Sequence, residues 1–363
     1  MHTHSPKSDT CKVCDSMKVQ IDAESDESQK RQLTLELELH KVQAEASYQK
    51  LKEDAAYSKS HPEVEMLTFD LEKSLPTPVL TMGVVYYKRQ LWTYNQGVHD
   101  CRRDRGCMHM WNESVASRGS HEVGSCIISH IKEMETDATH LILYSDACGG
   151  QNRNIYLVCL WLHIVASDEY SFTEIDHKFM ISGHSYLPND RDFGHIKQAR
   201  KKTMQIYVPE DWENVVRQAR RKNPFVVSKM TREDFVSLKT LKGAIVNRKV
   251  NTHGAKVEWL KIHWIAVSKD QPLQFRYRYS NNTLECWKTV DLKRRSKGRP
   301  PDLGKMVLPP LYTRPRVVNE KKVSDLLELL NYVPPIYHGF YQNLQGGNSD
   351  DSEEEQTHDS EED

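Results

Sequence analysis

The chain has 363 residues, of which 50 are Lys or Arg and 51 are Asp or Glu, so its balanced charge by itself suggests no partner. Nine of the acids lie in the last 14 residues, and the rest of the chain carries 50 bases against 42 acids, which weakly favours polyanionic partners. No stretch approaches about 18 consecutive apolar residues, which excludes a membrane span, and the N-terminus has no apolar signal core. Of the eight Cys, only one pair has CxxC spacing, which indicates free thiols and one metal site in an intracellular protein.

The first segment, residues 1–62, is expected to hold a small Cys/His zinc-binding motif and one long helix. Apolar residues recur at helical spacing from Leu33 through Leu37 to Leu51, and His61-Pro62 is expected to end the helix.

Residues 63–205 are predicted to form an α/β core whose order is β-β-β-α-β-α-β-α. The expected strands are VEMLTFDLEKSL, then VLTMGVVYYKRQ and LWTYNQGVHD as an antiparallel pair, then THLILYSD and HKFMISGHS. The expected helices are SHEVGSCIISHIKEME, the apolar IYLVCLWLHIVAS and DRDFGHIKQARKK, and the Cys-, Arg- and Met-rich stretch after the pair is expected to be a connection.

Residues 206–344 are predicted to be an α+β domain, in which VEWLKIHWIAV, LQFRYRYS and ECWKTVDLK form a small antiparallel sheet. Residues 345–363 are an acidic tail that cannot bury a core and is expected to be disordered.

Three acids follow the predicted core strands: Asp70 in LTFD, Asp146 in LILYSD and Asp190 in GHSYLPNDRDFG. If the first and fourth strands are parallel neighbours, Asp70 and Asp146 lie about 5 Å apart, and Asp190 at the start of the last helix can approach the same point. Carboxylates so close favour a divalent cation, and a pair of such ions can promote phosphodiester cleavage. The alternative is that each Asp only caps a turn or a helix, and Asp192 could replace Asp190.

Two more residues are candidates for the same site. Glu122 is expected on the helix that precedes the Asp146 strand, where it could be a fourth acid or an N-terminal-turn acid favoured by the helix dipole. His184 could act near the leaving group or shuttle protons, or it could be a loop hydrogen-bonder.

The order of strands and acids resembles the ribonuclease H-like fold of transposases and integrases, in which the first strand, the fourth strand and a late helix carry the metal-binding acids. The amino-acid sequence also resembles a family of transposon-derived proteins with a ribonuclease H-like domain of unknown function. This resemblance extends over nearly the whole chain except the acidic tail. The resemblance is carried by MWNESVASRG (110–119), YSDACGGQNRN (144–154), GHSYLPNDRDFGHI (183–196) and DLLELLNYVPPIYHGFY (325–341). It implies a mixed five-stranded sheet with flanking helices and the acids Asp70, Glu122, Asp146 and Asp190 at the metal site. Because related proteins carry sequence upstream of this start, the chain could be a truncated gene product.

Cys11-x2-Cys14 fits half of a tetrahedral zinc site, and His40 on the long helix is the best further ligand. His2 or His4 could supply the fourth, and the resemblance favours His4 because a His and a Pro precede the paired Cys in that family. The alternative is a reduced thiol pair without metal.

Basic clusters recur at KQARKK (197–202), RQARRK (217–222) and KRRSKGR (293–299), and their repetition makes phosphate contact plausible. KGRP at 297–300 resembles the core of an AT-hook for A·T-rich minor grooves, although a nuclear import signal or a basic loop would look the same. The nucleic-acid-binding candidates are Lys293, Arg294, Arg295, Lys297 and Arg299. In LQFRYRYS, the alternation could present Phe275, Tyr277 and Tyr279 to bases or could be one face of an ordinary sheet.

These observations predict a nuclear, transposase-derived polynucleotidyl transferase or nuclease that uses Mg²⁺ or Mn²⁺ at its carboxylates and structural Zn²⁺ at its N-terminus. Nucleic acid is the expected partner, with DNA favoured, and an oligomer is compatible with the sequence. The alternative function is a catalytically silent, domesticated DNA- or chromatin-binding protein that retains the fold.

Overall fold

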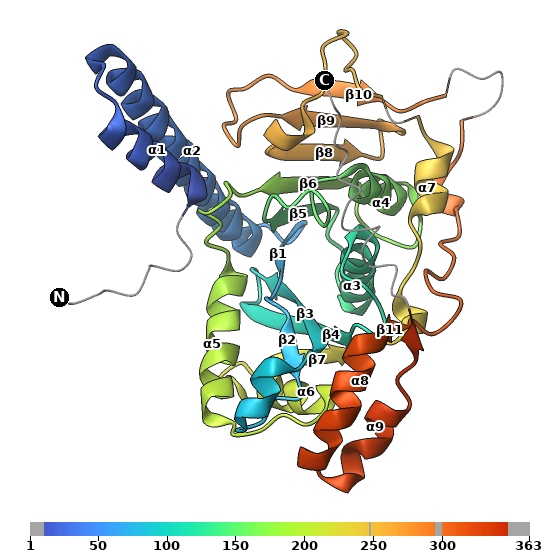
Figure 1. Ribbon diagram of the computed structural model, residues 1–363. Coiled ribbons are helices and arrows are strands. Elements are labelled where there is room, and N and C mark those ends of the chain that lie inside the picture. The colour runs from blue at the N-terminus through green and yellow to red at the C-terminus, as the bar shows by residue number, and fades with distance from the viewer. Residues whose placement is uncertain (1–10, 247, 295–299, 348–363) are drawn as a thin grey trace.

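A mixed sheet of ten strands runs through the computed structural model, which describes residues 11–246, 248–294 and 300–347 (Figure 1). From one edge to the other the strands are β10 (Lys288–Asp291), β9 (Gln274–Arg278), β8 (Trp264–Ser268), β6 (Glu174–Phe179), β5 (His140–Ser145), β1 (Val64–Leu71), β3 (Leu91–Asp100), β4 (Arg105–Asn112) and β7 (Val226–Lys229). The short β2 (Leu75–Thr77) pairs with β3, and a separate ladder joins β11 (Val318–Asn319) to β12 (Gly346–Gly347). The protein is therefore mixed α/β.

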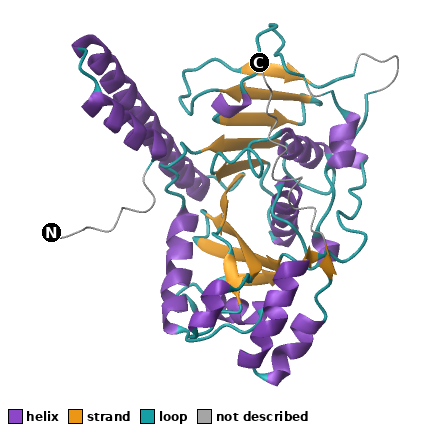
Figure 2. Cartoon of the chain, in the orientation of Figure 1, coloured by secondary structure: helices purple, strands orange, loops and turns teal. Residues whose placement is uncertain are grey.

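Helices cover both faces of this sheet (Figures 1 and 2). One face carries α3 (Ser120–Glu133), α4 (Ile155–Ala166) and α7 (Lys239–Ala244), and the other carries α2 (Glu27–Ser60) and α5 (Pro188–Lys202). The remaining helices are α1 (Lys12–Ala23) against α2, α6 (Pro209–Gln218) beside α5, and α8 (Glu320–Glu328) with α9 (His338–Gln342) near β2. In the described ranges, no helix is both long and apolar enough to cross a membrane.

The largest core lies under α3 and α4. Helix α4 buries almost every residue, because it is packed between the sheet, α3 and α7. Strand β5 is buried from Leu141 to Ser145, as expected for an apolar central strand with parallel neighbours on both sides. The predictions for these two segments are confirmed.

The long N-terminal helix is also confirmed. Helix α2 ends at Ser60, directly before His61-Pro62, and it buries the predicted face that includes Leu37, Ala44 and Leu51. Its N-terminal part projects from the body together with α1 (Figure 1), and its C-terminal part packs on β1.

The predicted antiparallel pair is wrong in one of its two strands. Residues Gly83–Tyr87, inside the segment VLTMGVVYYKRQ, form a turn of 3₁₀-helix, and β3 pairs instead with β4, the stretch expected to be a connection. The sequence RGCMHMWN of β4 has no β-branched residue, but β3 and β7 on either side supply its hydrogen bonds. Tertiary pairing overrides the local preference here.

The predicted C-terminal antiparallel strands exist, but they extend the core sheet beyond β6 and do not form a sheet of their own. The sheet is therefore continuous across residue 205, where a domain boundary is predicted. Phe275 and Tyr277 of β9 are buried in the main core, so for these two rings the alternative of an ordinary sheet face is correct.

Candidate carboxylate and metal centres

Asp70 and Asp146 lie at the same end of two adjacent strands. Strands β1 and β5 are parallel, and their register places Thr68 opposite Tyr144. Asp70 and Asp146 each follow two residues later, on the face of the sheet that packs against α2 and α5. The predicted parallel pairing of these two strands is therefore confirmed.

The N-terminus of α5 is fastened beside this point by Asn189. Its buried side chain accepts a hydrogen bond from Thr68 Oγ1 (2.6 Å) and donates one to the carbonyl of Gly97 (3.0 Å). A Cβ atom at Gly97 would lie 2.9 Å from the Phe193 ring, so a side chain there would force Phe193 of α5 to move. Asp190, the next residue, is thereby held near β1.

The three carboxylates interact electrostatically. The pKa of Asp70 is raised well above its usual range, first by burial and then by the negative charges of Asp146 and Asp190. Asp70 and Asp190 also accept hydrogen bonds from backbone amides. Asp70 Oδ1 accepts from Leu71 N (2.9 Å), and Asp190 Oδ2 accepts from Leu187 N (2.8 Å). The hydrogen bonds to backbone that the capping alternative predicts are therefore present at Asp70 and Asp190.

Sequence reasoning missed two side chains beside the carboxylates. Glu72 follows Asp70 at strand spacing, accepts a hydrogen bond from Asn95 Nδ2 (2.8 Å), and has a pKa raised by burial to about 7. Asn152, from the CGGQNRN turn, donates to Asp146 Oδ1, which also accepts from Cys148 N at 3.2 Å. The two-residue alternation could have identified Glu72, whereas the reach of Asn152 depends on how the turn folds back.

The other acidic candidates have different surroundings. Glu122 is buried, and its two oxygens accept from Gly119 N (2.8 Å) and from the Tyr312 hydroxyl, so it caps α3 and anchors a distant loop. Asp192 is fully buried, 2.6 Å from His99 Nδ1 and 3.2 Å from Arg220. Asp190, not Asp192, is the α5 acid that raises the pKa of Asp70.

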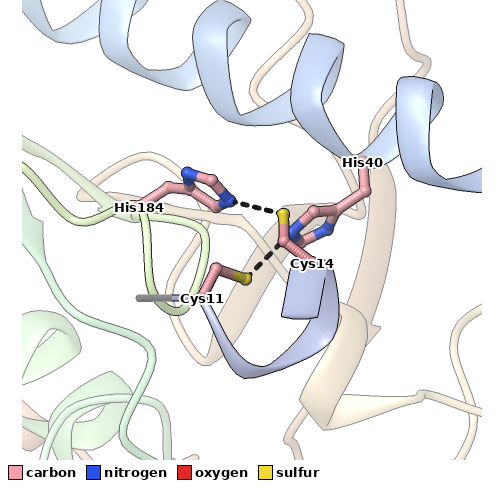
Figure 3. Close-up of side chains that lie close together, drawn as sticks. All are labelled: Cys11, Cys14, His40 and His184. Carbon is pink, nitrogen blue, oxygen red and sulfur yellow. Dashed lines mark hydrogen bonds between the residues drawn. The ribbon is translucent and has the colours of Figure 1, made fainter. Parts of the chain in front are cut away.

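A separate Cys/His group lies where α1, α2 and the loop after β6 meet (Figure 3). Cys11 Sγ lies 3.3 Å from His40 Nε2, and Cys14 Sγ lies 3.3 Å from His184 Nε2. The ligand atoms of these four residues all lie within 4.8 Å of one another, and in the described part of the chain no other set of three or more Cys, His, Asp or Glu residues does so. The three aspartates are therefore more widely spread.

The geometry of this group fits a tetrahedral ion. With Zn–S bonds of about 2.3 Å and Zn–N bonds of about 2.1 Å, a sulfur and a nitrogen on one tetrahedral ion are separated by about 3.6 Å. Burial lowers the pKa of His40, which favours the neutral imidazole that binds metal. The Cys11/Cys14/His40/His184 group could thus hold a metal ion such as zinc.

His184 was expected near the carboxylates, but its ring faces Cys14 in this group (Figure 3). Its loop reaches α1 because Gly183 has a φ of +76°, and a Cβ there would lie 2.6 Å from Cys11 Cα. His4, the predicted fourth ligand, lies outside the described residues. A ligand 170 residues after Cys14 has no signal in local spacing.

The basic candidates are only partly described. Lys293 and Arg294 follow β10, where the Lys293 carbonyl accepts from Arg248 (2.8 Å) and Arg294 donates to the Gly243 carbonyl. Arg295, Lys297 and Arg299 lie outside the described residues.

Comparison with known proteins gives no match: neither a family model, nor a curated protein, nor a solved structure resembles this chain significantly.

Proposed function

We propose that this chain is a transposon-derived protein with a ribonuclease H-like core that cleaves or transfers phosphodiester bonds in nucleic acid, with DNA in the nucleus as the favoured substrate. The observation that carries the proposal is that Asp70 and Asp146 lie at the same end of adjacent strands, with Asp190 near enough for its charge to act on Asp70. The two strand acids follow parallel neighbours, and the third opens a helix fastened to the same strand. These positions support the proposal, because the resemblance leads us to expect metal-binding acids on the first strand, the fourth strand and a late helix.

The donor set suits Mg²⁺ or Mn²⁺, because both ions prefer oxygen ligands. A cation there would relieve the repulsion that raises the pKa of Asp70. Bound ions of this kind supply activation of an attacking hydroxyl and stabilisation of the leaving oxygen.

The chain's own residues orient the carboxylates. Hydrogen bonds from Asn152 and from Cys148 N to Oδ1 of Asp146 fix the plane of that carboxylate. The Leu71 amide does the same for Asp70, and the Asn189 anchor holds the start of α5 against β1. A substrate hydroxyl or water would then attack the phosphorus in line, opposite the leaving oxygen.

Calorimetric titration of Mn²⁺ tests the proposal, with wild-type protein compared with the double variant Asp70→Asn, Asp146→Asn. We expect binding in wild type and loss of binding in the double variant. Asp168→Asn is the matched control, because this Asp is exposed and pairs with Lys269, away from the three aspartates in sequence. The titration is repeated with an oligonucleotide present, since nucleic acid can supply further ligands.

Cleavage provides the second test. Asp146→Asn should abolish cleavage of a DNA substrate without abolishing its binding. Unchanged cleavage by this variant would remove the assignment of the carboxylates.

The alternative function is a catalytically silent nucleic-acid-binding protein that keeps the fold. Both Glu122 oxygens are engaged, one by Gly119 N at the start of α3 and the other by the Tyr312 hydroxyl. This favours the silent alternative, because the carboxylate centre then lacks the fourth acid. Absence of Mn²⁺ binding both with and without oligonucleotide would support this alternative.

The Cys/His group has two sulfur and two nitrogen ligands, all from protein, which is the composition of a structural zinc site. Its role in this proposal is to join α1 and α2 to the loop that leads into α5.

A further inference from the structure

A row of alternating aromatic and cationic side chains crosses four strands of the sheet and ends just before a fifth. Tyr144 of β5 is opposite Lys178 of β6, which is opposite Trp264 of β8, which in turn is opposite Arg278 of β9. Trp287 directly precedes β10, beside Arg278. The row lies on the same face as Asp70 and Asp146, because Tyr144 is two residues before Asp146.

The members of the row are in close contact. Lys178 Nζ lies 4.0 Å from the Trp264 ring centroid, and the Arg278 guanidinium lies 5.0 Å from Trp264 and 4.0 Å from Trp287. Arg276, two residues before Arg278 on the same face of β9, lies 5.2 Å from the Trp287 ring. These distances are within the range of cation–π attraction.

The half of the row that contains Lys178 and the half that contains Arg276 and Arg278 differ in how their positive charge is balanced. Lys178 is covered by α2 and pairs with Asp54. Among the residues that the structure describes, neither Arg276 nor Arg278 forms a salt bridge, although Arg278 is only 8% exposed. The Nε of Arg278 is buried without a hydrogen-bond partner. The charges of Glu285 and Asp176 act on Arg278 from a distance, but among the described residues its buried Nε–H has no acceptor, so this half of the row is suited to an anionic ligand.

We propose that Arg276, Arg278 and Trp287 form a binding platform for single-stranded nucleic acid. The two guanidinium groups bind backbone phosphate, and the half-buried Trp287 ring stacks with a base. Stacking on a sheet face needs splayed bases, which a duplex does not offer. This inference deepens the proposed function by naming the class of ligand, and it rests on that function for the choice of nucleic acid.

The test is fluorescence anisotropy with labelled 20-nucleotide oligothymidylate and oligouridylate, and with a 20-base-pair duplex, all without divalent metal. We expect wild type to bind the single strands more tightly than the duplex, and the two single strands report whether DNA or RNA is preferred. Trp287→Leu should weaken binding of the preferred strand at least about fivefold, because one stacked base is lost. Arg276→Gln should lower the slope of log affinity against log salt by about 0.7, the value for one phosphate on a single strand.

Two exposed residues serve as matched controls, Lys305→Gln for charge and Tyr86→Leu for an aromatic ring. Both should bind as wild type does. Wild type that binds neither single strand, or Arg276→Gln with unchanged affinity and salt slope, overturns the proposal, and the second result remains decisive if Trp287→Leu does not fold.

The experiment also separates this platform from the carboxylate proposal. The double variant Asp70→Asn, Asp146→Asn should bind the single strand as wild type does, since no metal is present. Mn²⁺ binding without single-strand binding would leave the carboxylates in place and remove the platform.

Discussion

Replacement of Cys14 by Ser should release the N-terminal helix from the protein. The Cys14 thiol is buried 3.3 Å from His184 Nε2, and a serine hydroxyl is a poor zinc ligand. We expect purified wild type to hold one zinc ion per chain and Cys14→Ser to hold none.

The size of the effect follows from what else holds α1. A helix of 12 residues is marginal alone, with a nucleation cost of about 4 kcal/mol. Its apolar contacts are modest, since Leu37 of α2 is buried while Met17 and Ile21 are only half-buried, and they contribute about 2–4 kcal/mol. The two contributions nearly cancel, so the bound metal decides whether α1 stays docked.

Hydrogen exchange read by mass spectrometry measures this. Amides of Lys12–Ala23 should exchange at least about tenfold faster in Cys14→Ser or after chelation, while β5 amides keep their protection. Cys286→Ser is the matched control, because that thiol is free and exposed. Equal zinc content in variant and wild type, or equal protection of α1, would refute the reasoning.

Four further predictions follow from individual contacts. Gly183→Ala should weaken zinc binding, because the new Cβ would collide with Cys11 Cα. Competition for zinc with a chelator measures the affinity, and an unchanged affinity would contradict the prediction. Glu122→Gln should lower the free energy of unfolding by about 1–2 kcal/mol through its cap and leave Mn²⁺ affinity unchanged; a calorimetric loss of Mn²⁺ binding would return Glu122 to the carboxylate centre. Burial lowers the pKa of His109 to about 3. As the pH falls below about 6.5, this histidine is protonated in the unfolded state but stays neutral in the folded state, which favours unfolding. His109 should therefore lower the free energy of unfolding by about 2 kcal/mol at pH 5. Measured by urea unfolding, the free energy of unfolding of His109→Leu should fall about 2 kcal/mol less than that of wild type when the pH is lowered to 5. Parallel pH profiles of the two proteins would contradict this prediction. Asp54→Ala should destabilise by about 3–5 kcal/mol in urea unfolding, because it leaves the buried Lys178 unpaired, and a change under 1 kcal/mol would show that the pair is dispensable.

The sequence by itself determined the elements whose local signals agree with their final environment. Helix α2 ends where His61-Pro62 requires it to, and the apolar strand β5 and apolar helix α4 are buried as their composition predicts. Asp70 and Asp146 were also predictable as neighbours, because each comes at the end of a strand and parallel strands bring those ends together.

Only the tertiary structure decided those features of the fold and of the Cys/His group that depend on contacts between residues distant in sequence. Strand β4 exists because β3 and β7 hydrogen-bond to it, although its own residues have weak strand preference. His184 completes the Cys/His group only because Gly183 lets its loop approach Cys11. In β9 the alternation fixed two faces but not which one is buried, and the pairing of β8 with β6 turned Phe275 and Tyr277 into the core. A period of two defines a pair of faces, and only the rest of the fold determines which of them meets the core.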